Sequence, residues 1–208
     1  MHFFEKIRLL KERQFGEVAL QGVLQSKTFS LVFVTHDCVG KGDIISLFSR
    51  WRKKHEFWFQ AQFPVDDERT IVWLQKRVLD VPDRVLFLIE IEGAFVGHVG
   101  LFRYDENSRS IDIDNIVRGE EGHKGIMQEA LQLLMEWGKK ELGVKTFTLQ
   151  TTSDNEKALA LYRRLGFTET KRIPLTYRQT EEGGEWVETE RDDVKIGRYE
   201  VFMVRDER

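Results

Sequence analysis

Cysteine and proline are scarce in this chain of 208 residues, which contains one cysteine and three prolines. The lone thiol, Cys38, excludes an internal disulfide and is typical of proteins from a reducing compartment. The beginning of the sequence lacks the basic-then-apolar pattern of a signal peptide, and no apolar run approaches the length needed to span a membrane. We therefore expect a cytoplasmic protein that has no membrane partner.

An excess of positive charge is also missing, since the formal net charge is −3 and the pI is near 6.0. Basic residues gather only in the short run 50–55, so we expect no nucleic-acid partner. We also expect no metal site. The apolar content of 41% is ordinary for a folded protein, and the length suits one domain with one sizeable core.

Hydrophobic periodicity predicts an α+β fold in which one domain spans residues 1–208. Residues 1–28 form an N-terminal extension that is hard to interpret beyond a short helix over 3–13. A polar insertion lies near 178–197, and its part from 180 to 195 could serve dimerisation, giving a homodimer, or acceptor binding. The other predicted elements are strands at 29–36, 85–92, 94–104, 110–117, 145–152, 168–177 and 198–204, and helices at 42–54, 66–79, 126–142 and 153–165.

The most informative local feature is the loop Gly122-His-Lys-Gly125, which precedes the predicted helix 126–142. The first amides of a helix lack intrahelical partners and carry partial positive charge, and glycines let such a backbone approach an anion. The loop therefore suits a phosphate or pyrophosphate, although its glycines could equally serve only a tight turn. It is neither a Walker A motif nor a dinucleotide fingerprint, because no Gly-Lys-Ser/Thr follows and the preceding strands form hairpins.

A second motif follows about thirty residues later. Residues 122–131 read Gly-x-x-Gly-Ile-Met-x-x-Ala-Leu, and residues 155–167 read Asn-x-x-Ala-x-x-x-Tyr-x-x-x-Gly-Phe. In this order and separation the two motifs resemble the GNAT N-acetyltransferase superfamily, over about residues 29–167. The resemblance implies a mixed, mostly antiparallel central sheet that is splayed in the middle and flanked by helices. It also implies acetyl-CoA as co-substrate, held between the strands at 110–117 and 145–152.

The resemblance further implies which residues hold acetyl-CoA. The pantetheine arm would lie along the strand end, the pyrophosphate on the loop and helix start, and the sulfur near the asparagine and tyrosine of the second motif. The family commonly has Gln or Arg three residues before the first loop glycine, whereas Arg118 stands four residues before Gly122. The cofactor-binding candidates are Asn115, Ile116, Val117, Arg118, Gly122, His123, Lys124, Gly125, Ile126, Met127, Asn155 and Tyr162.

Acetyl transfer to an amine needs a donor for the leaving thiolate and a neutral amine. Tyr162 is the candidate acid, although its reference pKa of about 10 lies above the thiol's value of about 8.5, so a hydrogen bond could replace full proton transfer. The candidate bases are Asp112 and Asp114 on one strand and His98 on its hairpin partner; alternatively the carboxylates form only a solvated strand face. Backbone amides of Asn115 or Ile116 could stabilise the oxyanion.

The acceptor is expected to contact the aromatic and basic segment after the first long helix, through Trp51, Arg52, Phe57 and Trp58. Aromatic rings stack on sugar faces and guanidinium groups bind phosphates, and the sequence is similar to GNAT enzymes that acetylate nucleotide-linked amino sugars. We therefore expect a small-molecule amine, with a nucleotide-linked amino sugar as the favoured example. The alternatives are a protein or peptide amine acceptor, or a CoA-binding regulatory module without turnover.

Overall fold

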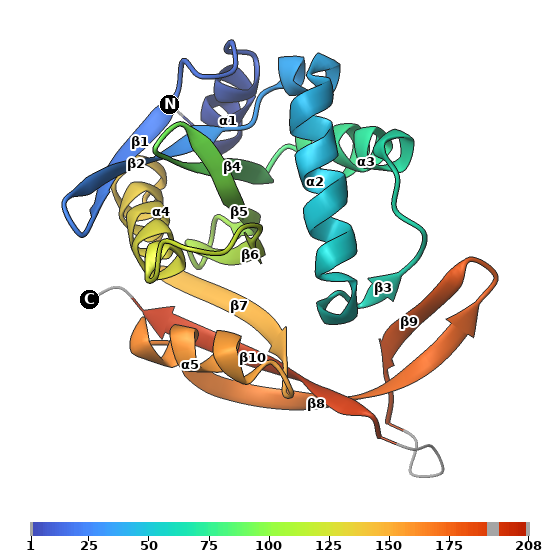
Figure 1. Ribbon diagram of the computed structural model, residues 1–208. Coiled ribbons are helices and arrows are strands. Elements are labelled where there is room, and N and C mark those ends of the chain that lie inside the picture. Colours follow the sequence, from blue (N-terminus) through green and yellow to red (C-terminus); the bar gives the residue numbers. More distant parts are fainter. Residues whose placement is uncertain (1, 191–195, 207–208) are drawn as a thin grey trace.

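The computed structural model describes residues 2–190 and 196–206, which build one ten-stranded sheet with helices on both faces (Figure 1). The strand order is β1-β2-β4-β5-β6-β7-β10-β8-β9-β3. The strands are β1 (Ala19–Leu24), β2 (Lys27–Phe33), β3 (Ala61–Gln62), β4 (Val85–Ile91), β5 (Ala94–Asp105), β6 (Ser110–Arg118), β7 (Thr146–Thr152), β8 (Thr168–Thr180), β9 (Gly183–Glu188) and β10 (Arg198–Asp206).

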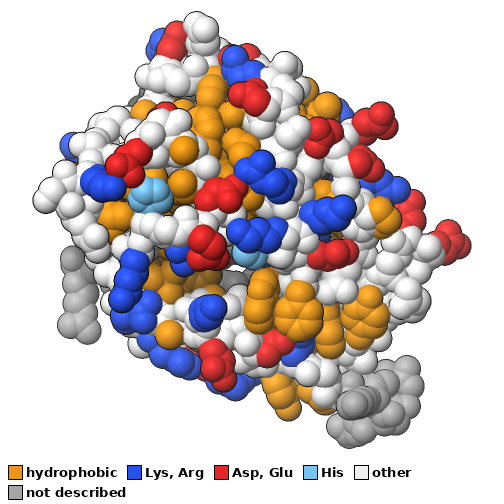
Figure 2. All heavy atoms as spheres, in the orientation of Figure 1, with side chains coloured by type: hydrophobic (Ala, Val, Ile, Leu, Met, Phe, Trp, Pro, Cys, Tyr) orange, Lys and Arg blue, Asp and Glu red, His pale blue; other side chains and the backbone are white. Residues whose placement is uncertain are grey.

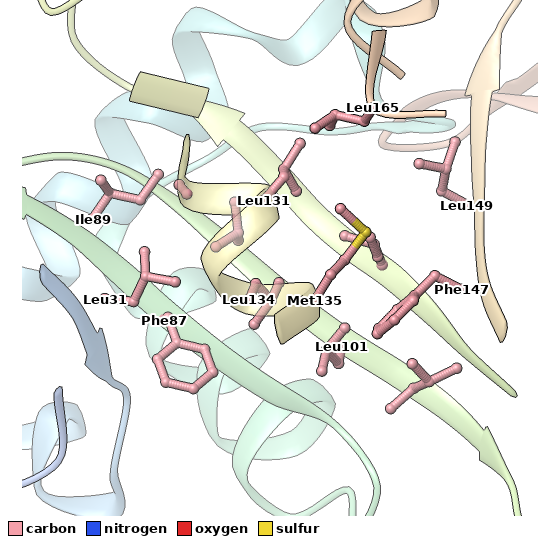
Figure 3. Close-up of a cluster of buried hydrophobic side chains, with 14 of the residues drawn as sticks. Leu31, Phe87, Ile89, Leu101, Leu131, Leu134, Met135, Phe147, Leu149 and Leu165 are labelled. Carbon is pink, nitrogen blue, oxygen red and sulfur yellow. The ribbon is translucent and has the colours of Figure 1, made fainter. Parts of the chain in front are cut away.

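Two hydrophobic clusters attach the helices to opposite faces of this sheet. Strand β4 shows how the sequence achieves this, because Phe87 and Ile89 point into one cluster while Leu86 and Leu88 point into the other. The larger cluster packs beneath α4, and Figure 3 shows its leucine and phenylalanine side chains. The α-helices are α1 (Phe3–Lys11), α2 (Gly42–Lys54), α3 (Asp67–Trp73), α4 (Ile126–Leu142) and α5 (Glu156–Arg164); short helical turns cover His36–Gly40 and Glu56–Trp58, and a π-helical segment covers Leu74–Leu79.

The sheet opens between its two central strands, β6 and β7. These strands are parallel and pair at only three positions, from Ser110 with Thr146 to Asp112 with Thr148. Beyond Asp112 the two strands part, whereas every other neighbouring pair in the sheet is antiparallel. The predicted mixed, mostly antiparallel sheet splayed in the middle is therefore confirmed.

The edges of the sheet differ from the sequence-based prediction. Strands β1, β3 and β9 were not predicted, and the predicted strand 29–36 ends at Phe33 because Thr35 leads into a helical turn. The region 1–28 contains α1 and β1, and its Phe3, Ile7 and Leu24 belong to the larger hydrophobic cluster. The predicted insertion 178–197 contains the end of β8 and all of β9, while its residues 191–195 lie outside the described residues.

In the described part of the chain, no helix has the length and apolar character that crossing a membrane requires.

Candidate functional site

A cavity of about 1100 Å³ opens where β6 and β7 part. Figure 2 shows basic and acidic side chains interspersed across the middle of this face, above a group of hydrophobic side chains. Most of the residues singled out in the sequence line the cavity, namely Arg52, Trp58, His98, Asp112, Asp114, Asn115, Ile116, Val117, Arg118, His123, Gly125, Ile126, Met127, Asn155 and Tyr162. Four others do not contribute to its lining, namely Trp51, Phe57, Gly122 and Lys124.

A bulge in β6 marks the rim where the strands separate. His98 pairs with Val117 and Gly100 with Asp114, so Asn115 and Ile116 together face a single residue of β5. Asn115 has φ of 50°, a left-handed conformation in which asparagine is tolerated better than most residues. The bulge turns the backbone around Ile116 toward the cavity, to which Asn115 and Ile116 both contribute.

His98 supports this bulge from below. Its Nδ1 lies 2.7 Å from the carbonyl oxygen of Asn115, and a carbonyl only accepts, so Nδ1 carries the proton. The ring packs 5.3 Å from Phe48 and 6.0 Å from Trp51, measured between centroids. Burial lowers the pKa of His98 to about 4, so the imidazole is neutral at physiological pH. This geometry disfavours the predicted role of His98 as a base and favours a role in positioning Asn115.

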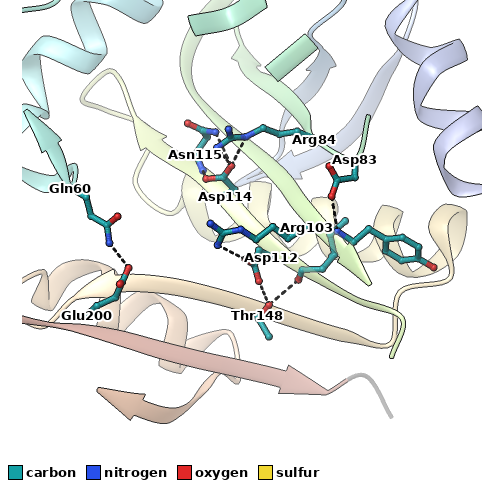
Figure 4. Close-up of polar contacts among 11 residues, drawn as sticks. Gln60, Asp83, Arg84, Arg103, Asp112, Asp114, Asn115, Thr148 and Glu200 are labelled. Atoms are coloured by element: carbon teal, nitrogen blue, oxygen red, sulfur yellow. Dashed lines mark hydrogen bonds and ion pairs between the residues drawn. The ribbon is translucent and has the colours of Figure 1, made fainter. Parts of the chain in front are cut away.

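The two strand aspartates are both committed to neighbouring side chains (Figure 4). Asp114 accepts hydrogen bonds from Nε of Arg84 at 2.8 Å and from the backbone amide of Asn115 at 2.7 Å. Asp112 accepts from the hydroxyl of Thr148 and, at 3.2 Å, from Nη1 of Arg103. Neither carboxylate is a free, solvated strand group, and neither is available as a base without losing these partners. The amide of Asn115 is likewise occupied, which leaves Ile116 as the oxyanion-binding candidate.

The glycine loop folds into a series of left-handed turns before α4. Gly122, His123 and Gly125 have φ of 92°, 40° and 94°, and α4 begins directly afterwards at Ile126. Arg118 donates to the carbonyl oxygen of Gly122 at 2.5 Å and lines the cavity, whereas Lys124 is exposed away from it. The N-terminus of this 17-residue helix therefore faces the cavity, with Arg118 rather than Lys124 as the adjacent cation.

Helix α5 brings Asn155 and Tyr162 to the opposite wall. Asn155 is the N-cap of α5, since its Oδ1 accepts from the amide of Ala158 at 3.3 Å. The predicted helix 153–165 therefore begins later, at Glu156, and the Ser153 hydroxyl accepts from the amide of Tyr199 at 3.0 Å. Tyr162 is 5% exposed, and burial raises its pKa above the ordinary phenol value. Such a phenol donates a hydrogen bond readily but resists giving up its proton.

The aromatic and basic segment divides between core and cavity. Trp51 is fully buried, its Nε1 donates to Glu120 at 2.8 Å, and its ring occupies the space beside Gly119. Arg52 does line the cavity, with its guanidinium 3.5 Å from the centroid of Phe59 and a pKa lowered by burial to about 10. Phe57 instead packs against Arg198, with the guanidinium 4.5 Å from its ring centroid.

The cavity residues that the sequence did not single out include Thr152 at the end of β7 and Glu200 near the start of β10. Both are 6% exposed, and Nε2 of Gln60 donates to Glu200 at 2.6 Å. The available signal was a single carboxylate within the strand Tyr-Glu-Val-Phe-Met-Val, which is otherwise largely apolar. A buried carboxylate needs a partner, and its position in such a strand marks it as a candidate for function.

Comparisons with known proteins agree with this arrangement. The family model described as "Acetyltransferase (GNAT) domain" matches residues 39–168. A spermidine N(1)-acetyltransferase of Escherichia coli (strain K12) is 29% identical over 112 residues, which are 54% of this chain and 59% of that relative. The chain thus matches little more than half the length of this relative.

Two solved structures show the fold. A spermidine N-acetyltransferase from Vibrio cholerae, in complex with CoA and spermine, superposes with a TM-score of 0.64 at 14% identity, covering 86% of this chain and 95% of that one. FdhC, described as a nucleotide-linked sugar GNAT, superposes with a TM-score of 0.60 at 16% identity, covering 90% of this chain and 91% of that one. At these identities the likeness concerns the fold alone.

Proposed function

The chain belongs to the GNAT acetyltransferase family, and we propose that it transfers an acetyl group from acetyl-CoA to the primary amine of a small molecule. The observation that carries this proposal is the parting of β6 and β7 after three residue pairs. The gap places the bulge at Asn115 and Ile116 on one side of the cavity and Tyr162 on the other.

The residues around the gap fit acetyl-CoA. Left-handed backbone at Gly122, His123 and Gly125 opens the N-terminus of α4 to a pyrophosphate, with Arg118 beside it. The free edge of β6 near Ile116 and Val117 suits the amides of a pantetheine arm, and Asn155 and Tyr162 line the far end. When bound, acetyl-CoA would supply an activated acetyl group and a thiolate leaving group.

The chain's own residues would then act on the reacting atoms. A backbone amide at Ile116 would stabilise the oxyanion, and one such donor is worth about 3 kcal/mol. The Tyr162 hydroxyl would donate a hydrogen bond to the developing thiolate, since its raised pKa opposes full proton transfer. With Asp112 and Asp114 committed to Arg103 and Arg84, loss of the amine proton would proceed through water or another cavity carboxylate.

The acceptor favoured by the cavity is a small amine. The basic run 50–55 was expected to meet a nucleotide, yet Arg50 pairs with Glu120 and Lys54 donates to the carbonyl oxygen of Gly119. Of its arginines and lysines only Arg52 lines the cavity, together with His55. This weakens the case for a nucleotide-linked amino sugar, which remains a candidate through the likeness to FdhC. The spermidine acetyltransferase relative supports a polyamine as the acceptor.

The lone, buried Cys38 supports our proposal of a cytoplasmic location.

The test is to mix the protein with acetyl-CoA and a panel of polyamines, amino sugars, nucleotide-linked amino sugars and peptides, measuring thiol release and acetylated product. We expect turnover of at least one small amine. Tyr162→Phe should lower kcat about 100-fold while leaving the Kd for acetyl-CoA nearly unchanged, because the ring still packs. Tyr104→Phe is the matched control, since Tyr104 packs on Phe3 outside the cavity.

Two results would contradict this proposal. Tight acetyl-CoA binding without turnover of any amine would favour a CoA-binding regulatory module. Turnover that Tyr162→Phe leaves unchanged would remove Tyr162 from the chemistry.

A further inference from the structure

Thr152 and Glu200 stand directly opposite each other on neighbouring antiparallel strands. They are register partners between β7 and β10, so their side chains lie on the same face of the sheet with Cβ atoms about 5 Å apart. That face lines the cavity, at the point where β7 ends. A hydroxyl and a carboxylate thus meet at one position of the cavity wall.

Among the described residues the Thr152 hydroxyl has no hydrogen-bond partner, and the Glu200 carboxylate has only a neutral one. Oγ1 of Thr152 is buried and has no hydrogen-bond partner among the described residues, which costs about 1–3 kcal/mol for a polar atom. Only 6% of Glu200 is exposed, and its carboxylate accepts a hydrogen bond from the neutral side-chain amide of Gln60.

The other cavity carboxylates are treated differently. Asp112, Asp114, Glu121 and Asp154 each form an ion pair with an arginine, and Glu156, the remaining one, is exposed to solvent at the start of α5. For Glu200 the described residues provide no ion pair, and burial together with Glu188 raises the pKa of its carboxyl group against the weaker opposing effect of Arg103 and Lys171. An arriving cation would relieve both the unpaired charge and the unpaired hydroxyl.

We propose that Glu200 and Thr152 form the binding site for an ammonium group of the acceptor, which makes the protein selective for cationic amines. An ammonium carries three N–H donors and no acceptor, so it can bond the carboxylate and the hydroxyl at once. Gln60 holds Glu200 in place from the segment between α2 and α3 (Figure 4). This inference rests on the proposed function only in calling the ligand an acceptor.

Binding without turnover provides the first test. Calorimetry would compare 1,4-diaminobutane with its uncharged analogue 1,4-butanediol, on the full chain with no acetyl-CoA present. We expect the wild type to prefer the diamine, and Glu200→Gln to lose about 10- to 100-fold of that preference because a charged hydrogen bond is removed. Equal preference in the two proteins would overturn the inference even if the protein acetylates amines.

Kinetics provides the second test, with spermidine as acceptor. Glu200→Gln should raise the acceptor KM about tenfold or more while leaving kcat within a few-fold and the acetyl-CoA Kd unchanged. A fall in kcat at constant KM would overturn the binding role. Glu136→Gln on α4 is the matched control, because Glu136 is exposed and does not line the cavity.

Substitutions of Thr152 distinguish a role in acceptor binding from a role in stability. Thr152→Val keeps the shape but removes a hydroxyl that has no partner in the described protein, so its Tm should not fall while its acceptor KM rises several-fold. Thr152→Ser should behave as the wild type. A Thr152→Val protein with lower Tm and unchanged KM would show that the hydroxyl serves the fold and would contradict the proposed site.

Discussion

At the scale of single residues, the buried imidazole of His98 makes stability depend on pH. Its folded-state pKa of about 4 lies below the ordinary 6.5, so the unfolded chain binds the proton more tightly. Its contribution is therefore complete above pH 6.5 and is lost as the pH falls toward 4. Linkage gives a loss of about 2 kcal/mol between pH 7.5 and pH 5.

His98→Asn tests this prediction, because it removes the titrating group and keeps an N–H donor for Asn115. Urea unfolding at pH 7.5 and pH 5 should show a smaller loss for the variant than for the wild type. His36→Asn, at an exposed position, serves as the control and should keep the wild-type dependence. Parallel pH dependence in the wild type and His98→Asn would contradict burial of a neutral imidazole.

The residue scale also shows what the sequence can and cannot predict. Motif spacing singled out Asn155 and Tyr162, and both line the cavity, because their relative position follows from one short helix. The commitment of Asp114 to Arg84 was not predictable, since the two residues are 30 positions apart and meet only through the sheet. Trp51 was assigned to the acceptor wall because helical periodicity does not distinguish the core-facing side from the cavity-facing side.

At the scale of elements, α4 begins and ends with a left-handed glycine, and these two glycines provide a matched pair. Gly125 has φ of 94° and Gly143 has φ of 70°, and neither would place a new Cβ within 3.4 Å of a neighbouring atom. Alanine at either position should therefore cost backbone strain of about 1–2 kcal/mol. Only Gly125 lines the cavity, beside the helix end proposed to hold a pyrophosphate.

Gly125→Ala and Gly143→Ala should accordingly lower the free energy of unfolding by similar amounts. Only Gly125→Ala should weaken acetyl-CoA binding, about tenfold or more, because it shifts amides that face the pyrophosphate. Urea unfolding and calorimetry measure the two effects. Equal affinity in both variants would argue against the loop as the pyrophosphate site.

The sequence predicted the elements that have a long hydrophobic periodicity, and it missed the strands that form only through pairing with a neighbouring strand. The apolar stripe of α4 and the Gly143 cap defined that helix correctly. Strand β3 has two residues and β9 begins with two glycines, so neither carries a strand pattern; β9 forms by pairing with β8, and β3 by pairing with β9. Tertiary pairing of this kind leaves no local signal.

At the scale of the whole molecule, the sheet joins two functional halves. The proposed acetyl-CoA site uses β6, α4 and α5, whereas the proposed acceptor site uses Glu200 and Thr152, with Gln60 holding Glu200 in place. Gln60 belongs to the segment before β3, and β3 attaches to the hairpin β8–β9 at the far edge. The amide of Trp186 in β9 donates to the carbonyl oxygen of Gln60 at 2.9 Å. The hairpin therefore fixes the position of Gln60, which in turn contacts Glu200.

Weakening the pairing of β3 with β9 should impair acceptor binding without affecting acetyl-CoA binding. A Cβ at Gly183 would lie 2.0 Å from the carbonyl oxygen of Gln62, so Gly183→Ala must push β3 away from β9. Gln60 would move with it and release Glu200, and displacements near 1 Å can cost about 100-fold in rate. We expect a rise of about tenfold or more in acceptor KM with an unchanged acetyl-CoA Kd.

Gly40→Ala is the control, because a Cβ there meets nothing within 4 Å. If Gly183→Ala weakened acetyl-CoA and acceptor binding alike, the two halves would be one cooperative site. Selective loss of the acceptor would show that the hairpin β8–β9 serves recognition. The edge strands β9 and β3, which have the weakest sequence signal, would then support acceptor binding by holding Gln60 against Glu200.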